Sequence, residues 1–351
     1  MAFCIMKHLE AGTRHPYCTG MRTLLLVTLA GALCAQTPQN PPPSAEEAPA
    51  TIQVDVNVVN VLASVRDKRG GLVANLDRND FAISEDGKPQ DIKYFARETD
   101  LPLTIGLLID VSGSQRNLLD IERSAAAQFF SQVLRKKDEA FLISFGEECE
   151  LLQDYTGSAR LLTRGMDGLR ISSGVGGYGP GPVPTAGGPR GTVLYDAVFL
   201  AADEKLRTEV GRKVIVLITD GVDEGSQKTI DAAIEAAQKA DAVIYSIDYS
   251  DPRAYGGFGP FGGFGGGAGE GYLRRMSDAT GGHVYVVGRN HPLEEVFREL
   301  QEEMRSQYSI GYTSTNDKRD GTYRKLDVRL KDKNLKAQVR KGYYALKPDA
   351  R

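Results

Sequence analysis

Residues 101–115 read LPLTIGLLIDVSGSQ, and this stretch decides the fold of the chain. An apolar run of strand length ends in Asp110, which is followed by Ser112 and Ser114 with one glycine between them. Consecutive rather than alternating apolar residues are typical of a strand that is covered on both faces. The polar residues therefore lie where this strand ends and the next helix begins, the place where open α/β sheets bind ligands.

The chain beyond this strand alternates between helical and strand patterns. Apolar strand patterns at 139–145, 213–219 and 242–248 are separated by amphipathic helical patterns, the first of them at 117–136. This alternation predicts an α/β domain over residues 101–305, with a doubly wound, mostly parallel sheet. The first helix is expected to bury one apolar side, made of Leu118, Leu119, Ile121, Phe129, Val133 and Leu134.

Both flanks of this domain have β patterns. Apolar residues alternate at Val54, Val56 and Val58, and the dipeptide at 86–87, Asp-Gly, is a strong hairpin signal. The flanks, 51–100 and 306–346, are each too short for an independent core. We therefore predict that they form the two parts of one small β-sandwich into which the α/β domain is inserted. Two separate β appendages are the alternative.

The N-terminal part predicts export. Residues 21–36, MRTLLLVTLAGALCAQ, have the layout of a secretory signal peptide, so we expect residues 1–35 to be a presequence. A lipid anchor at Cys34 and a short buried helix are the alternatives. Residues 36–50 are Pro-rich and read as a linker. No other apolar run is long enough for a membrane helix, so the mature protein is expected in the periplasm or outside the cell, without an integral membrane segment.

Composition and motifs argue against several classes of function. The net charge is −3, so there is no basic excess for nucleic acid. Two Gly-rich stretches, 172–191 and 255–271, contain GxGxxG matches, but neither follows the first strand, so we expect no nucleotide. These stretches are either rims of a partner site or low-complexity insertions. His283 and His291 do not accompany a nucleophile, which argues against a Ser–His–Asp hydrolase.

Further polar residues are expected at the edge reached by the first strand. Thr192 begins a helical pattern and Asp220 ends a strand pattern, so both join Asp110, Ser112 and Ser114 at one edge. This set holds hydroxyl and carboxylate oxygens without His or Cys, which favours a hard divalent cation such as Mg²⁺, Mn²⁺ or Ca²⁺. The alternative is that the serines are ordinary helix caps and that the site holds no metal.

These five residues, in this order, resemble the metal-ion-dependent adhesion site of von Willebrand factor type A domains. The family pattern is Asp-x-Ser-x-Ser, then Thr, then Asp, and the segments GTVLYDA (191–197) and VIVLITDG (214–221) support it. The resemblance implies a Rossmann-like domain in which the two serines and the threonine bind metal directly and the two aspartates bind largely through water. The flanks, through residues 65–92, also resemble exported bacterial type A proteins often found in acidobacteria.

The resemblance implies an adhesion-type module rather than an enzyme. Its partner would be a protein that offers an acidic side chain to the cation. A metal-assisted hydrolase is one alternative, and its candidate general bases are Asp223 and Glu224. A scaffold that binds through its β domain, with the metal site empty, is the other.

Overall fold

The computed structural model describes residues 58–97, 101–115, 118–172, 191–249 and 268–347. The expected presequence and linker and most of the two Gly-rich stretches therefore lie outside the described residues. Within the described ranges, no helix has the length and apolarity needed to cross a membrane.

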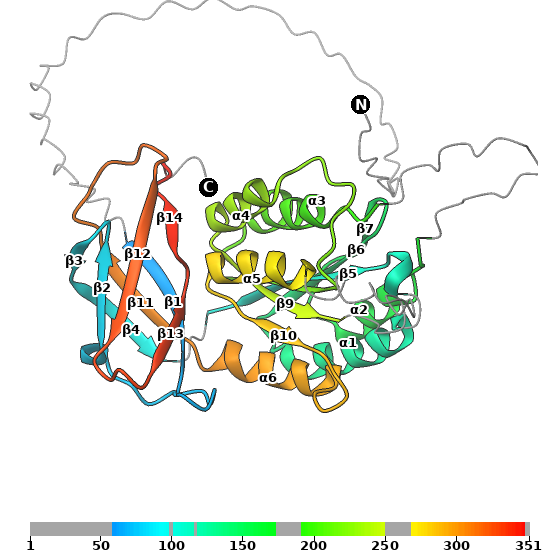
Figure 1. Ribbon diagram of the computed structural model, residues 1–351, viewed down its shortest axis with the longest axis horizontal. Helices are drawn as coiled ribbons and strands as arrows, with labels where there is room; N and C mark the ends of the chain where they lie inside the picture. Colours follow the sequence, from blue (N-terminus) through cyan, green and yellow to red (C-terminus); the bar gives the residue numbers. More distant parts are fainter. Residues whose placement is uncertain (1–57, 98–100, 116–117, 173–190, 250–267, 348–351) are drawn as a thin grey trace, which may run out of the picture. The chain divides into compact units, whose positions relative to one another are not determined.

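The central sheet is built around β5 (Leu103–Asp110), the apolar strand that ends in Asp110. The strand order is β10-β9-β8-β5-β6-β7, parallel except at β7, which is an antiparallel edge strand (Figure 1). β5 is followed in the chain by its neighbour β6, whereas β8 lies on its other side, so the connections diverge between β5 and β8. Ligands bind at such points in open sheets. The other strands are β6 (Glu139–Phe145), β7 (Cys149–Thr156), β8 (Arg212–Thr219), β9 (Ala242–Asp248) and β10 (Val284–Val286).

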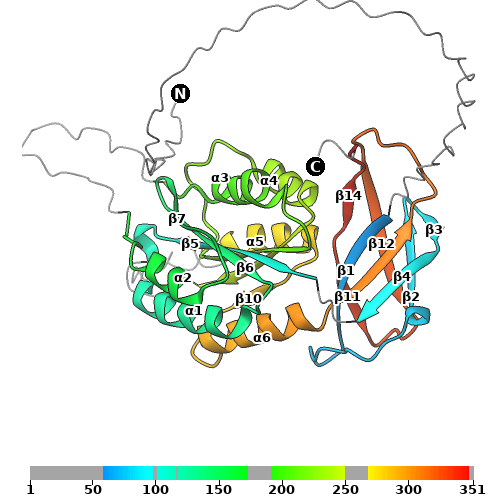
Figure 2. The ribbon, with the colours of Figure 1, turned by 180° about the vertical axis from the view of Figure 1, so that it is seen from behind.

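Helices cover both faces of this sheet, which confirms the doubly wound α/β fold (Figures 1 and 2). Leu107 of β5 packs in the core beneath α1, α2 and α6, and Leu108 packs in the core beneath α3, α4 and α5. At Gly106 a Cβ atom would lie 2.4 Å from the Phe141 ring, so only glycine fits there. The helices are α1 (Leu119–Val133), α2 (Ala159–Met166), α3 (Leu194–Phe199) with a π-helical continuation (Leu200–Leu206), α4 (Ile230–Lys239), α5 (Ala268–Thr280) and α6 (Leu293–Arg305).

The buried side of α1 differs from the predicted one. Ile121 is 46% exposed, whereas Glu122 is fully buried. The buried stripe runs through Leu119, Ala126 and Val133, and a residue two positions after Leu119 lies about 200° around the helix from it. The prediction for Ile121 was therefore wrong, because two small alanines and a glutamate complete the stripe in place of large apolar residues.

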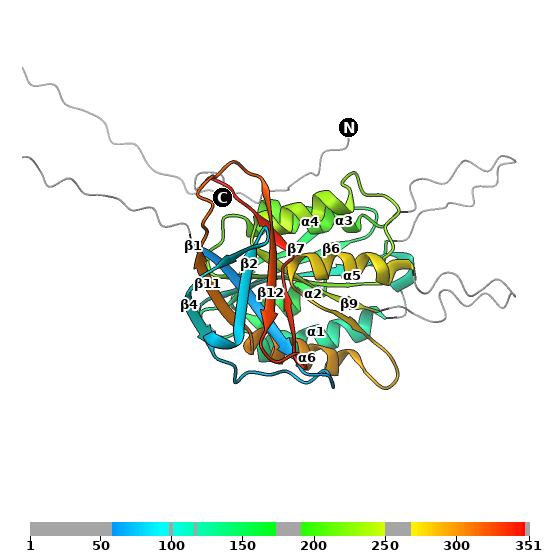
Figure 3. The same ribbon diagram turned by 60° about the vertical axis from the view of Figure 1, so that its left-hand side comes forward.

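The flanks form two antiparallel four-stranded sheets, and each sheet contains strands from both flanks (Figure 3). One has the order β13-β1-β11-β4 and the other β14-β12-β2-β3. The predicted joint sandwich is thus confirmed, because neither flank completes a sheet alone. The strands are β1 (Val58–Arg66), β2 (Phe81–Glu85), β3 (Lys88–Gln90), β4 (Ile92–Arg97), β11 (Tyr308–Thr313), β12 (Tyr323–Leu330), β13 (Lys336–Val339) and β14 (Gly342–Tyr344).

Two details of the sandwich correct the sequence patterns. In β1 the buried residues begin at Val59 and Val61, and Val58 is exposed, so the expected phase was shifted by one residue. Adjacent valines at 58 and 59 make both phases possible locally, and pairing with β11 selects one. The segment LKAQVRKGYYAL (335–346) has the pattern of a single strand, but it forms β13 and β14 in different sheets, because the chain crosses between sheets near Arg340.

Residues 56–351 form one compact unit, and side-chain contacts join the sandwich strands to the central domain within it. Arg66 of β1 pairs with Glu303 of α6, which also accepts a 2.7 Å hydrogen bond from the Tyr285 hydroxyl. Gln338 of β13 donates to the Gly282 carbonyl at 2.7 Å. Two residues separate α6 from β11, so the chain enters the sandwich directly from the last helix.

Candidate metal centre

Asp110 is held at the end of β5 by two hydrogen bonds. Its Oδ1 accepts from the Ser112 backbone N–H at 2.8 Å, and its Oδ2 accepts from the Thr219 hydroxyl at 2.6 Å. Thr219 is the last residue of β8, so the aspartate is tied to its own loop and to the neighbouring strand. The side chain has no solvent exposure, which fixes its position behind the loop.

Ser112, Ser114 and Asp220 form a continuous polar cluster in front of Asp110. The two serine hydroxyl oxygens lie 3.0 Å apart, and the Ser114 hydroxyl donates to Asp220 Oδ2 at 2.7 Å. Asp220 follows β8, and its Oδ1 accepts from the Val222 backbone N–H at 3.1 Å. The carboxyl ends of the adjacent strands β5 and β8 thus bring together residues more than a hundred positions apart, as the strand pattern predicted.

Thr192 completes the set from a third segment. It lies just before α3 and is only 8% exposed, yet its hydroxyl makes no hydrogen bond to any described residue. Thr192, Ser112, Ser114 and Asp220 line one pocket of about 340 Å³. The structure therefore brings four of the five predicted residues to one pocket and places the fifth, Asp110, directly behind them.

The surroundings of Asp110 disfavour its charged form. Burial raises the pKa of Asp110 to about 7, and the charge of Asp220 acts in the same direction, whereas hydrogen bonds from Thr219 and Ser112 oppose the shift. The donors are all oxygens, three of them hydroxyls, which fits a hard divalent cation. No group of three or more His, Cys, Asp or Glu side chains suited to a metal occurs among the described residues.

Two residues of this pocket were not predicted from the sequence, Glu147 and Ser172. Glu224, named in the sequence only as a candidate general base, lines the pocket with them. Glu147 follows β6, the other neighbour of β5, so the strand order would have placed it at this edge. Of the two candidate bases, Asp223 is turned to the start of α3, where its Oδ1 accepts from the Tyr195 backbone N–H at 3.2 Å, and it also accepts from the Ser226 hydroxyl at 2.5 Å.

A buried acid on α1 lies close enough to influence this site. Glu122 is fully buried against the sheet, and neither carboxyl oxygen has a hydrogen-bond partner. Burial raises the pKa of Glu122 well above its ordinary value, the charge of Asp110 adds to the shift, and Arg123 opposes it. Such a carboxyl is expected to destabilise the folded state.

Replacing Glu122 by leucine should therefore raise the free energy of unfolding by about 1–3 kcal/mol at alkaline pH, because it removes an unpartnered buried carboxyl. The folded state holds this proton more tightly than the unfolded state, so wild-type stability falls as the pH rises above the ordinary glutamate pKa. Urea unfolding at acidic and alkaline pH checks both effects. Glu122→Gln cannot ionise, so its stability should no longer fall as the pH rises, but it should not show the additional gain expected for leucine. A leucine variant less stable than the wild type at alkaline pH would contradict the prediction.

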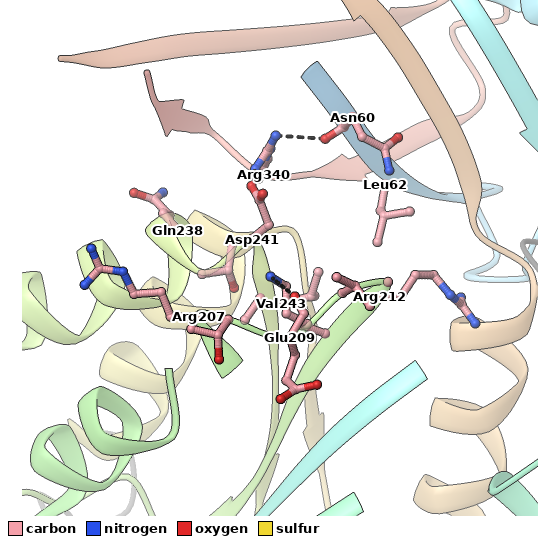
Figure 4. A pocket seen from close by; sticks show the side chains of 15 residues that line it. Asn60, Leu62, Arg207, Glu209, Arg212, Gln238, Asp241, Val243 and Arg340 are labelled. Carbon is pink, nitrogen blue, oxygen red and sulfur yellow. Dashed lines mark hydrogen bonds and ion pairs between the residues drawn. The ribbon is translucent and has the colours of Figure 1, made fainter. Parts of the chain in front are cut away.

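A second pocket, of about 410 Å³, lies at the opposite, amino-terminal ends of the strands (Figure 4). Its arginine side chains are already engaged, and Arg207 pairs with Asp203 at 2.9 Å. Arg340 pairs with Asp241 and donates to the Asn60 carbonyl at 2.8 Å, and Arg212 donates to the Met304 carbonyl at 2.6 Å. Figure 4 shows Arg207 and Arg212 pointing to opposite sides. This pocket contains none of the site residues predicted from the sequence. It lies at the junction between β1, β13 and the central domain.

The strand order, the helices on both faces and the hydroxyl and carboxylate cluster at the carboxyl edge agree with the arrangement that the sequence resemblance implies. Neither the family models nor the curated proteins compared with this chain give a match.

Several solved structures are similar to part of the chain. The von Willebrand factor domain of the type V pili tip protein Mfa5 from Porphyromonas gingivalis is 13% identical, with a TM-score of 0.42, and the match covers 58% of this chain and 95% of that one. An aerotolerance-related membrane protein from Bacteroides fragilis is 14% identical, with a TM-score of 0.38, covering 58% and 98%. Proximal thread matrix protein 1 from the mussel byssus, with a zinc-occupied MIDAS motif, is 13% identical, with a TM-score of 0.44, covering 64% and 50%.

Proposed function

We propose that the central domain binds a divalent cation in the pocket of Thr192 and, through that cation, an acidic side chain of a partner protein. One observation carries the proposal: Thr192, a residue only 8% exposed whose hydroxyl makes no hydrogen bond to a described residue, lines the same pocket as Ser112, Ser114 and Asp220. Hydroxyl and carboxylate oxygens are the ligands that Mg²⁺, Mn²⁺ and Ca²⁺ accept in proteins.

The residues divide into two roles in this proposal. Ser112, Ser114 and Thr192 would hold the cation, which would supply an electrophilic binding point for an anionic oxygen. Asp110 and Asp220 would balance its charge and orient water around it. Because the hydroxyls are neutral, they leave the cation able to attract a further negative ligand. A carboxylate of the partner is the ligand that protein surfaces most readily offer.

We favour binding over catalysis and export over an intracellular location. A hydrolase needs a general base beside the cation. Asp223 is occupied at the start of α3, which leaves Glu224 alone of the two candidates at the pocket. Export continues to rest on the predicted presequence at 1–35.

A calorimetric titration of the full chain with Mg²⁺ or Mn²⁺ tests the proposal. We expect saturable binding in the wild type and an affinity at least about tenfold lower in Thr192→Val and Ser112→Ala, because each variant removes one oxygen and little volume. Ser131→Ala, which removes an exposed hydroxyl on α1, is the matched control and should bind like the wild type. A wild type that binds neither cation, or variants that bind as tightly, would refute the proposal.

A further inference from the structure

The pocket carries more negative charge than one divalent cation neutralises. Three acidic residues line it, Asp220, Glu147 and Glu224, and Asp110 lies directly behind them. No lysine, arginine or histidine is found among the described residues that line the pocket. A bound divalent cation would thus leave a surplus of negative charge around the position that a partner must occupy.

Glu147 and Glu224, here called the acidic rim, lie on two different sides of the loop after β5. Glu147 is in the turn after β6, where the Gly146 N–H donates to the Glu148 carbonyl at 3.1 Å. Glu224 is in the loop after β8, and its N–H donates to the Thr192 carbonyl at 3.1 Å. Because β6 and β8 flank β5 in the sheet, the two backbone anchors hold the rim on opposite sides of Ser112 and Ser114.

The rim carboxylates are available to a partner. Both residues are exposed, and neither forms an ion pair or side-chain hydrogen bond with a described residue. Like charges brought together at an interface are unfavourable, and opposite charges there select partners. The rim therefore disfavours a second acidic residue next to the one that reaches the cation, and it favours a basic residue in the same place.

Building on the proposed function, we infer that the acidic rim selects partner segments in which the cation-binding acid is flanked by lysine or arginine, and that it rejects acidic runs. Thr192 is only 8% exposed and its hydroxyl makes no hydrogen bond to a described residue, so its place in the pocket identifies the pocket as a ligand site, and the rim then defines the class of ligand. Recognition would combine one carboxylate on the cation with basic neighbours on Glu147 and Glu224.

Three labelled peptides provide the test, each with a central glutamate flanked on both sides by lysine, by serine or by glutamate. Their binding to the full chain is measured by fluorescence anisotropy with Mg²⁺ and with chelator. We expect the lysine-flanked peptide to bind about tenfold or more tightly than the glutamate-flanked one. Glu147→Gln with Glu224→Gln should narrow this preference, and Glu147→Lys with Glu224→Lys should reverse it.

The control is Glu148→Gln with Glu150→Gln, which makes the same charge change on exposed residues that do not line the pocket. The inference would be overturned if the rim variants kept the wild-type preference for the lysine-flanked over the glutamate-flanked peptide. It would also be overturned if this control changed that preference as much as the rim variants do. So would the absence of Mg²⁺-dependent peptide binding. Cation titration without peptide separates the two proposals: retained cation binding would leave the metal centre standing, whereas its loss would remove both.

Discussion

Arg324→Leu is expected to lower the free energy of unfolding by about 3–5 kcal/mol, because it leaves a buried glutamate without its counter-charge. Arg324 of β12 and Glu85 of β2 have side chains only 1% and 2% exposed, and Arg324 Nη1 lies 3.3 Å from Glu85 Oε1. Denaturant unfolding of the full chain, followed by circular dichroism, measures the loss.

The remaining contacts of this pair explain the size of the effect. Glu85 accepts hydrogen bonds from the Tyr312 and Ser314 hydroxyls, both at 2.6 Å, and Arg324 donates to the Asn316 carbonyl at 2.6 Å. Glu85 comes from the N-terminal flank, and the other members come from the C-terminal flank. The network therefore ties the two flanks together inside the sandwich core, and a leucine can replace none of its donors.

Arg329→Leu is the matched control on the same strand. Arg329 pairs with Asp327 at 2.7 Å, but the side chains are 81% and 47% exposed. An exposed pair of this kind contributes about 0–1 kcal/mol. If Arg324→Leu cost no more than Arg329→Leu, the buried pair would have no special role in the stability of the sandwich.

Gly269→Ala is expected to weaken cation binding by about tenfold or more while the chain remains folded. A Cβ atom on Gly269, at the start of α5, would lie 1.9 Å from the Asp220 carbonyl oxygen. Gly221, with φ +80°, packs against the same segment, since its Cβ would lie 2.6 Å from the Gly269 carbonyl oxygen. Backbone must move to admit either atom, and Asp220 is then carried away from Ser114.

Gly271→Ala is the control for this prediction, because a Cβ at Gly271 meets nothing within 4 Å on the same helix. It should bind Mg²⁺ like the wild type and gain up to about 1 kcal/mol of helix stability. Calorimetric titration and thermal unfolding of both variants give the comparison. Equal cation affinity in the two variants would show that the backbone around Asp220 tolerates the added methyl.

The edge of the central sheet at which the candidate metal centre lies could be predicted from the sequence, because the carboxyl edge of a parallel sheet is set by the direction of the chain. In a parallel sheet every strand ends at the same edge, so apolar runs that end in Asp110 and Asp220 suffice to place their carboxylates together. The same reasoning places Thr192 at the start of a helix at that edge. No knowledge of individual contacts is needed for this step.

Pairing across distant parts of the chain decided the rest. The phase of β1, with Val59 rather than Val58 buried, is selected by its register with β11. The burial of Glu122 depends on how α1 packs against the sheet, and the orientation of Asp223 toward α3 depends on its hydrogen bonds with Tyr195 and Ser226. Local periodicity determined the elements, their order and the edge where the site lies. Only tertiary packing determined which side chains of those elements face the pocket, because that choice is made by neighbours far away in the sequence.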